Sequence, residues 1–193
     1  MKKLVLLLSI VGLVSGCSGK APESAYYVRD GVDLEYIETI AILPFGNYTG
    51  DKTIDSRIRD MTITEVLASK KFDVVDRGIV DSTLQEMALA NQNSFDLPVI
   101  KVLGKRLNVK AFLAGNVNKI AGSGKSAYSY PEISLTLHLI DAESGQILWR
   151  STSYKNGYSV VNRLFDLDPI DEFEITVDLL SEMIASIPKA ANN

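Results

Sequence analysis

Cysteine and histidine are almost absent from this sequence, which contains one of each among 193 residues. Structural zinc sites take four Cys or His ligands, so such a site is excluded, and a scaffold of disulfide bonds is excluded as well. Most nucleophilic and acid–base constellations also lack a member when only Cys17 and His138 are available. We therefore predict a protein that is not an enzyme and that holds no metal or cofactor.

Long basic runs are lacking too, and acidic residues outnumber basic ones by 24 to 20, which gives a net charge of −4. A protein that binds nucleic acid needs clustered Lys and Arg to neutralise phosphates, so we expect no nucleic-acid partner. Apolar residues, in contrast, are plentiful, since 46% of the chain is hydrophobic and 23% is charged. This composition supports one folded domain with a substantial core.

The amino terminus has the pattern of a bacterial secretory signal. Lys2 and Lys3 precede an apolar run at residues 4–14, which is about half the length that a helix needs to cross a bilayer. The sequence Val-Ser-Gly-Cys that follows ends at Cys17 and resembles the lipobox of bacterial lipoproteins. The resemblance implies that residues 1–16 are removed as a signal peptide and that Cys17 is lipidated.

A lipid anchor would hold the protein on a membrane without a spanning helix, because several acyl chains at about 0.8 kcal/mol per CH₂ bind almost permanently. Ser18 follows the cysteine, and by resemblance to lipoproteins this implies sorting to the outer membrane, at its periplasmic face. Residues 17–33 mix Gly, Pro, Ser and charges and predict a lipidated tether that reaches at most about 58 Å. Residues 34–189 are predicted to form a single domain, followed by a tail at residues 190–193.

The domain changes its hydrophobic period along the chain, which predicts an α/β sandwich with a mixed sheet packed against helices. A continuously apolar stretch at residues 40–43 indicates a buried strand, whereas three- and four-residue spacing from Ile54 to Val66 indicates a helix. Strict alternation at residues 133–139 is typical of a half-buried strand. The predicted order is β-α-β-α-α-β-β-β-α, with strands at 36–45, 72–76, 110–120, 133–139 and 146–154 and with the first three helices at 54–71, 79–91 and 99–107.

The final helix and the alternating strand predict a shared core. We expect Asp168 to cap this helix, with Pro169 and Asp171 in its first turn, and Asp96 to cap the third helix. Parallel pairing is expected in the early part, because parallel strands need helical crossovers, and antiparallel pairing in the later hairpins. The expected core residues are Leu135, Leu137, Leu139, Phe173, Val177 and Leu180.

Two patterns suggest chemistry but have plainer explanations. Residues 122–126, Gly-Ser-Gly-Lys-Ser, resemble the end of a phosphate-binding loop, but the position that requires glycine holds Lys119 and predicted strands flank the segment. A flexible hairpin loop is the better interpretation. His138 lies on the polar face of its strand beside Ser134 and Thr136, which favours a surface or helix-packed histidine over a catalytic base.

Candidate contact residues lie in and after the last predicted strand. A tryptophan in a small domain is normally a core or subunit-contact residue, but on a lipid-anchored protein an indole also suits the lipid headgroup boundary. The segment at residues 158–165 is too apolar for a solvated loop and is expected to pack on a neighbour or touch the membrane. The predicted membrane or subunit contacts are Trp149, Tyr158, Leu164 and Phe165.

Four stretches together resemble the fold group of CsgG-like lipoproteins and the TolB amino-terminal domain. They lie at residues 40–51, 72–77, 103–117 and 139–145, and the resemblance covers about residues 34–187. Because these motifs are strand ends and turns, they specify a fold well and a function poorly. The curli pore of this group inserts extra hairpins to build a transmembrane barrel, with about nine to eleven residues per strand, and this chain has no room for them between its core strands.

A compact lipoprotein of this group without those hairpins most resembles the PelC family of exopolysaccharide export. The resemblance implies a homo-oligomeric ring that guides a cationic polysaccharide toward an outer-membrane export channel, as in biofilm formation. Removal of Lys2 and Lys3 with the signal lowers the net charge from −4 to −6, which suits a cationic polymer because repeated subunits multiply an acidic patch. We predict that Asp166, with Asp141 and Glu143, lines the acidic opening.

The rival resemblance is to LpoB, a lipoprotein activator of a peptidoglycan synthase with a related fold. That activator resembles a domain on a long tether that reaches across the periplasm, whereas the tether predicted here is short. A hydrolase with paired carboxylates is a third class, for which only the acidic residues at 166–174 argue. Acids before and within a helix's first turn are ordinary complements of its dipole, so Asp168 and Asp171 favour capping, and Asp166 is the better functional candidate. We expect the export function, with the synthase activator as the alternative.

Overall fold

A seven-stranded mixed sheet forms the centre of the protein in a computed structural model that describes residues 24–90, 92, 95–121, 130–158 and 171–188. The strand order is β1-β7-β6-β5-β2-β4, and β3 pairs with β5. The α/β class with a mixed sheet packed against helices is confirmed. The strands are β1 (Ser24–Val28), β2 (Thr39–Ile42), β3 (Gly46–Asn47), β4 (Asp73–Val74), β5 (Ala111–Ala121), β6 (Glu132–Asp141) and β7 (Ile147–Asn156).

The direction of each pairing follows from the connections between strands. β2 runs parallel to β4 and to β5, and helices lie between these strands in the sequence, as parallel pairing requires. β5, β6 and β7 are consecutive and antiparallel, and β1 adds an antiparallel edge strand to the outer side of β7. The expected division into an early parallel part and a later antiparallel part is therefore observed.

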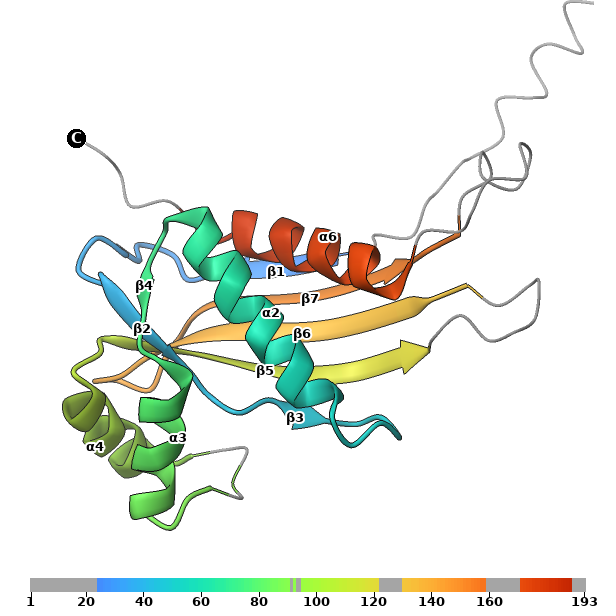
Figure 1. Cartoon of the computed structure of the whole chain (residues 1–193). Coiled ribbons are helices and arrows are strands. Elements are labelled where there is room, and N and C mark those ends of the chain that lie inside the picture. The colour runs from blue at the N-terminus through green and yellow to red at the C-terminus, as the bar shows by residue number, and fades with distance from the viewer. Residues whose placement is uncertain (1–23, 91, 93–94, 122–129, 159–170, 189–193) are drawn as a thin grey trace, which may run out of the picture.

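Helices cover both faces of the sheet. α2 (Ile54–Ser69) and α6 (Glu172–Ala185) lie side by side across the long strands, while α3 (Arg77–Glu86) and α4 (Leu97–Leu107) pack together beside the β2 end of the sheet (Figure 1). Successive side chains of a strand point to opposite faces, so Leu113 of β5 joins the core beneath α2 and α6, whereas Phe112 joins the core beneath α3 and α4. The sheet thus separates two apolar cores.

The core beneath α2 and α6 contains most of the residues predicted for it. Leu135, Leu137, Leu139 and Leu180 are fully buried there. Val177 is only partly buried, and the expectation for Phe173 is wrong, because its side chain is 67% exposed. Helix α6 has apolar residues on more than one side. The side that packs on the sheet is adjacent to the one on which Phe173 and Val177 lie. It consists of Ile175, Thr176, Leu179, Leu180, Met183 and Ile184.

The N-termini of three helices are capped by carboxylates, and in α3 the cap is Asp76, which accepts from the Gly78 N–H at 2.8 Å. The side chain of Asp96 accepts a hydrogen bond from the Val99 N–H at 3.1 Å, as predicted for α4. In α6 the capping residue is Asp171, which accepts from the Glu174 N–H at 2.7 Å, so the helix begins after Asp171 rather than after Asp168. In the part of the chain that the structure describes, no helix is long and apolar enough to cross a membrane.

Strand β1 lies within the segment predicted to be a tether. Residues 24–28, Ser-Ala-Tyr-Tyr-Val, pair with β7 in a continuous register from Ser24 opposite Ser153 to Val28 opposite Trp149. Four of the five side chains are exposed, so this edge strand lacks the alternation that marks a half-buried strand. The folded domain therefore includes residues from Ser24 onward. Gly46 and Asn47, which follow the strand predicted at residues 36–45, likewise pair with β5.

Candidate interaction surfaces

Trp149, predicted to contact the membrane or a subunit, lies in the core instead. Its side chain has no solvent exposure, and the indole Nε1–H donates a hydrogen bond to the Ser186 hydroxyl at 3.1 Å. Trp149 stands opposite Leu139 in the β6–β7 register, on the sheet face that α6 covers. This position corrects the predicted contact role, because the ring is out of reach of a lipid or a neighbouring protein.

Asp141 and Glu143 flank the turn between β6 and β7, and both carboxylates are engaged within the protein. Asp141 is 8% exposed, and it accepts hydrogen bonds from the Ser144 N–H and O–H, each at 2.6 Å, and from the Tyr36 hydroxyl at 2.9 Å. Burial raises the pKa of Asp141, but these hydrogen bonds outweigh it and hold the pKa below its usual value. Glu143 is exposed and pairs with Lys101 at 3.0 Å. Asp141 thus holds its turn together, and the predicted place of Asp141 and Glu143 in an acidic opening stays a prediction.

The same hydrogen bond affects its donor. Burial and the contact with Asp141 raise the pKa of Tyr36 to about 12, so the phenol stays protonated throughout the physiological range. Its proton points to a carboxylate inside the protein. Tyr36 therefore joins the segment before β2 to the β6–β7 turn.

Tyr158 is the one predicted contact residue that the structure describes on the surface. Its side chain is 44% exposed, and its ring stacks edge to face on Tyr130 with 5.0 Å between the ring centres. Its predicted contact role stays a prediction. Cys17, Leu164, Phe165 and Asp166 lie outside the described residues.

His138 lies on the sheet face opposite the core beneath α2 and α6, between Ala114 of β5 and Arg150 of β7. Burial and the positive charge of Arg150 lower its pKa to about 4, so the imidazole is neutral at pH 7. Within the described residues its Nδ1 atom is buried without a hydrogen-bond partner. In this part of the chain, no carboxylate accepts from Nδ1 as it would to orient a general base.

Polar side chains surround His138 on that face of the sheet. The Asn118 amide donates to the Thr136 hydroxyl at 2.9 Å, and the hydroxyls of Thr136 and Thr152 lie 3.1 Å apart. Arg150 is exposed, and Tyr27 stands opposite it in the β1–β7 register with half of its side chain exposed. We call the exposed surface around Tyr27, Arg150 and Thr152 the polar sheet face. It offers hydrogen-bonding groups and an aromatic ring to a partner.

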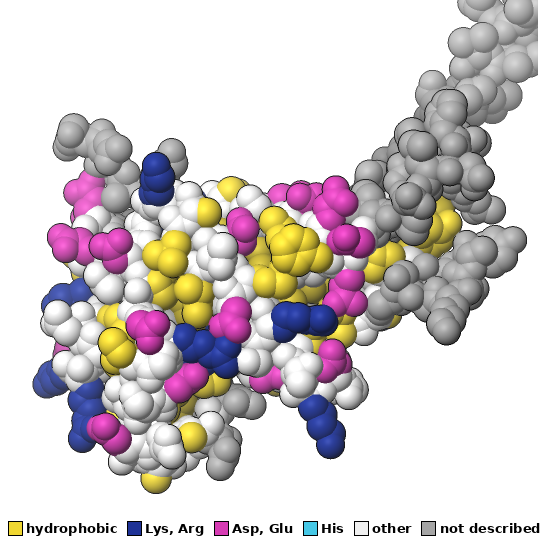
Figure 2. Space-filling model, viewed as in Figure 1, with side chains coloured by type: hydrophobic (Ala, Val, Ile, Leu, Met, Phe, Trp, Pro, Cys, Tyr) yellow, Lys and Arg dark blue, Asp and Glu magenta, His cyan; other side chains and the backbone are white. Residues whose placement is uncertain are grey.

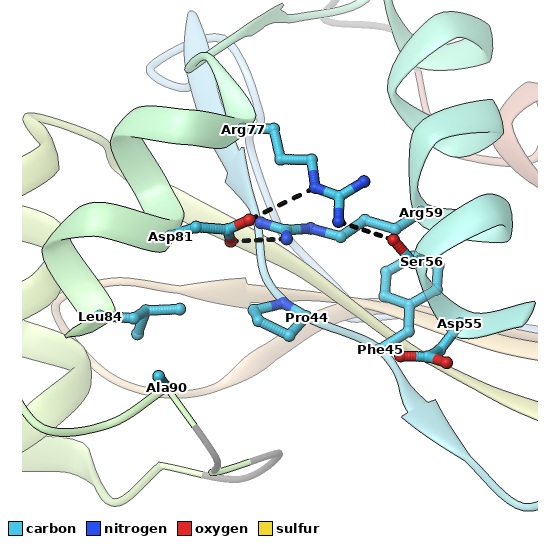
Figure 3. Close-up of a pocket in the computed structure, with 9 residues that line it drawn as sticks. All are labelled: Pro44, Phe45, Asp55, Ser56, Arg59, Arg77, Asp81, Leu84 and Ala90. Atoms are coloured by element: carbon cyan, nitrogen blue, oxygen red, sulfur yellow. Dashed lines mark hydrogen bonds and ion pairs between the residues drawn. The ribbon is translucent and has the colours of Figure 1, made fainter. Parts of the chain in front are cut away.

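A cavity of about 240 Å³ opens between α2 and α3, below the residues that follow β2 (Figure 3). Arg59 of α2 is 3% exposed, and its guanidinium donates to the Ile42 carbonyl at 2.7 and 3.0 Å and to Asp81 of α3 at 2.6 Å. Arg77 donates to the other oxygen of Asp81 at 3.3 Å and to the Ser56 hydroxyl at 2.7 Å. One carboxylate is therefore shared by two guanidinium groups.

This arginine cluster joins three elements. Burial lowers the pKa of Arg59, and the contact with Asp81 opposes the shift. Because its donors are directed at Ile42 and Asp81, the cluster acts as a bracket between α2, α3 and the end of β2. The arginine cluster was not predicted from the sequence. The available signal was an arginine beside Ile58, at the border of the apolar stripe of α2.

A second cavity, of about 440 Å³, lies at the C-terminal end of α4. Lys101, Lys105 and Lys110 line it, and so do Gly104, Asp141, Ala142 and Glu143. Gly104 and Ala142 are closely packed, because a Cβ atom added at Gly104 would lie 2.8 Å from the Cβ of Ala142. Lysines and carboxylates therefore both line this cavity, and Lys101 pairs with Glu143.

Comparison with known proteins relates the chain to envelope lipoproteins. The model of the family described as peptidoglycan-synthase activator LpoB matches residues 21–153. A PelC dodecamer from Paraburkholderia phytofirmans has a similar structure, with 15% identity, a TM-score of 0.58 and coverage of 88% of this chain and 99% of that chain; a PelC variant from the same organism gives 16% and 0.61 with the same coverage. No curated protein matches the chain in sequence.

Lipoprotein GNA1162 from Neisseria meningitidis is similar as well, with 18% identity, a TM-score of 0.51 and coverage of 67% of this chain and 99% of that chain. At these identities the structural likeness shows the fold alone. The fold is that of LpoB-like and PelC-like lipoproteins, which narrows the expected resemblance and does not support the CsgG-like group specifically.

Proposed function

Because this chain belongs to the family of the peptidoglycan-synthase activator LpoB, we propose that it is an outer-membrane lipoprotein that activates a peptidoglycan synthase by binding to it. The observation that carries the proposal is the match of the family model to residues 21–153, which include every strand from β1 to most of β7. Of the two expected functions, the family match favours the synthase activator. The protein acts through its surface and performs no catalysis of its own.

The polar sheet face is the surface that we propose for the synthase. Tyr27 and Arg150 stand opposite each other there, and Tyr27 is 50% exposed. An arginine and a tyrosine at the centre of a contact are typical anchors, because each combines a large contact area with hydrogen-bond donors. The arginine cluster is a weaker candidate for this contact, because the Arg59 donors are directed at acceptors within the protein and not at solvent.

The test is a glycan polymerisation assay with the synthase purified from the same envelope, with and without the lipidated protein. We expect the wild-type protein to raise the polymerisation rate, and Arg150→Glu to weaken both binding and activation. Lys52→Glu is the matched control, because Lys52 is also exposed and lies two residues before α2, the helix that packs on the opposite face of the sheet. Wild-type protein that neither binds nor activates the synthase would refute the proposal.

Lipidation is a separate part of the proposal. We infer that the signal peptide ends at residue 16 and that Cys17 carries the lipid. Replacement of Cys17 by Ala is expected to move the protein from the membrane fraction to the soluble periplasmic fraction. Retention of the variant on membranes would contradict the anchor.

Export of an exopolysaccharide is the second candidate, and the likeness to the PelC dodecamer over 88% of this chain favours it. In this case the protein would form a ring at the periplasmic face of the outer membrane and guide a cationic polysaccharide to a channel protein. Asp166 is the acidic residue that we propose for guiding the polymer, because Asp141 is engaged in its turn. Asp166→Asn and then Asp166→Lys should reduce export in that order at normal protein abundance.

One experiment separates the two functions. The lipidated protein is captured from its native envelope, and the proteins that accompany it are identified. A peptidoglycan synthase among them supports the activator. An outer-membrane export channel without any synthase would overturn the activator in favour of export.

A further inference from the structure

The outer side of helix α4 combines basic and apolar side chains. Lys101, Val102, Lys105 and Arg106 follow one another at helical spacing on this side, and Val102 is 45% exposed. Lys101 pairs with Glu143 and Arg106 with Glu86, whereas Lys105 makes no ion pair within the described part of the chain. Lys110 adds a further cation at the end of the helix. We call this surface the α4 stripe.

The outer side of helix α6 has the opposite charge and a similar apolar element. Phe173 is 67% exposed beside Glu174, and Asp178 and Glu182 continue the surface one and two turns further on. The helix contains no basic residue. Figure 2 shows acidic side chains gathered around apolar ones over α6, whereas dark blue basic side chains occur around the end that carries α4. We call this surface the α6 stripe.

Some of the charge on the α6 stripe is compensated within the molecule. Lys155 pairs with Asp178 at 3.4 Å and with Glu182 at 2.7 Å. Glu174 makes no ion pair among the residues that the structure describes, and so its charge faces solvent beside an exposed phenyl ring. Lys105 has the corresponding position on the α4 stripe, beside the exposed Val102.

The two stripes lie on opposite sides of the sheet. The buried side of α6 packs on Leu135, whereas the buried side of α4 packs on Phe112, and these belong to the two separate cores. The outer sides of the two helices therefore face away from each other. One molecule cannot bring its own stripes into contact.

We propose that the α4 stripe of one copy of this protein binds the α6 stripe of a second copy. Charge complementarity selects the partner, because the basic and apolar surface of one copy meets the acidic and apolar surface of the next. The contact uses two different surfaces, so each copy keeps one stripe open for a further subunit, and the assembly grows head to tail into a ring or a filament. Exposed Val102 and Phe173 supply the apolar centre of the contact.

This proposal gives the export function a subunit contact, but its test reads self-association alone. Failure of the contact is therefore distinguishable from failure of either proposed function. A contact made by one surface with its own copy, or a stripe that binds only a foreign protein, would give different results in the same experiment.

The test uses two single substitutions in the full-length lipidated protein in detergent, with mass measured by sedimentation velocity at moderate salt. Lys105→Glu inactivates the α4 stripe, and Glu174→Lys inactivates the α6 stripe, and neither removes an ion pair of the described structure. We expect the wild-type protein to form species larger than dimers and each variant to associate at least ten-fold more weakly. Lys52→Glu, which changes the net charge in the same sense and by the same amount as Lys105→Glu, should assemble like the wild-type protein.

Mixing the two variants tests the head-to-tail arrangement. In an equimolar mixture the two intact stripes can pair with each other and the two substituted stripes can pair through their swapped charges, so the mixture should regain species larger than dimers in which the two variants alternate. A chain with both substitutions has a swapped pair of charges and should regain the larger species. The proposal would be overturned if both single variants assembled like the wild-type protein. It would also be overturned if the mixture stayed monomeric and the doubly substituted chain failed to assemble. Equal thermal stability of all variants shows that a folding defect is not the cause.

Discussion

Replacement of the only tryptophan should change the stability of the protein rather than its attachment to the membrane. Trp149 has no solvent exposure and hydrogen-bonds to Ser186 at 3.1 Å. A buried Trp→Ala substitution costs about 3–5 kcal/mol through lost burial and the cavity left behind. Domains of this size are typically stable by about 5–15 kcal/mol, so Trp149→Ala should remove a large share of the free energy of unfolding.

Two milder variants separate packing from hydrogen bonding. Ser186→Ala keeps the indole but leaves its N–H buried without this acceptor, at a cost of about 1–3 kcal/mol. Trp149→Phe removes the donor together with part of the ring. Combining Trp149→Phe with Ser186→Ala should cost less than the sum of the two single changes, because the second change has no indole N–H left to orphan.

Urea unfolding measures these differences. Circular dichroism follows all variants, and tryptophan fluorescence follows those that keep Trp149, which is the sole reporter in the chain. Membrane fractionation is run in parallel. A Trp149→Ala protein whose unfolding free energy stays within 1 kcal/mol of the wild-type value, and which leaves the membrane, would place the indole at the lipid surface and refute the reasoning.

Four further changes have defined outcomes. Arg59→Ala removes a buried guanidinium that donates to the Ile42 carbonyl and to the half-exposed Asp81, and should lower the unfolding free energy by about 1–3 kcal/mol in urea; a loss below about 1 kcal/mol would contradict the bracket. Gly104→Ala should cost about 1–3 kcal/mol through overpacking against Ala142, seen as a lower Tm. The depressed pKa of Asp141 stabilises the fold above its unfolded pKa, so Asp141→Asn should be less stable at pH 7, and the gap should close as the pH falls through the folded pKa. Phe173→Ser should alter the unfolding free energy by less than about 0.5 kcal/mol, because the ring is mainly exposed.

The sequence predicts those elements whose hydrophobic period reflects one buried side. The alternation at residues 133–139 identifies β6, since every second side chain enters the core beneath α2 and α6. Strand β1 has no such signal, because it is held at the sheet edge by backbone pairing and most of its side chains are exposed. In α6, apolar residues occur on several sides. Periodicity alone therefore predicted Phe173 as a core residue, whereas Ile175 is the residue that is buried against the sheet.

The candidate sites were harder to predict because they depend on contacts between distant segments. Asp141 and Tyr36 are 105 positions apart, and their hydrogen bond decides that the carboxylate serves a turn. Arg59 and Asp81 come from different helices, and no local sequence pattern predicts their ion pair. The α4 and α6 stripes are visible in the sequence as charged helices, but only the topology of the sheet shows that they face in opposite directions.

Strand β1 also shortens the distance between the folded domain and a lipid at Cys17. Only residues 18–23 separate that cysteine from Ser24, so the start of β1 would lie within about 25 Å of the membrane surface. Subunits confined to so thin a layer meet by lateral diffusion, at an effective concentration far above that of the same number of molecules dispersed in the periplasm. A contact too weak to be populated by detached protein would then form on the membrane, and the number of copies per unit area would decide when assembly begins.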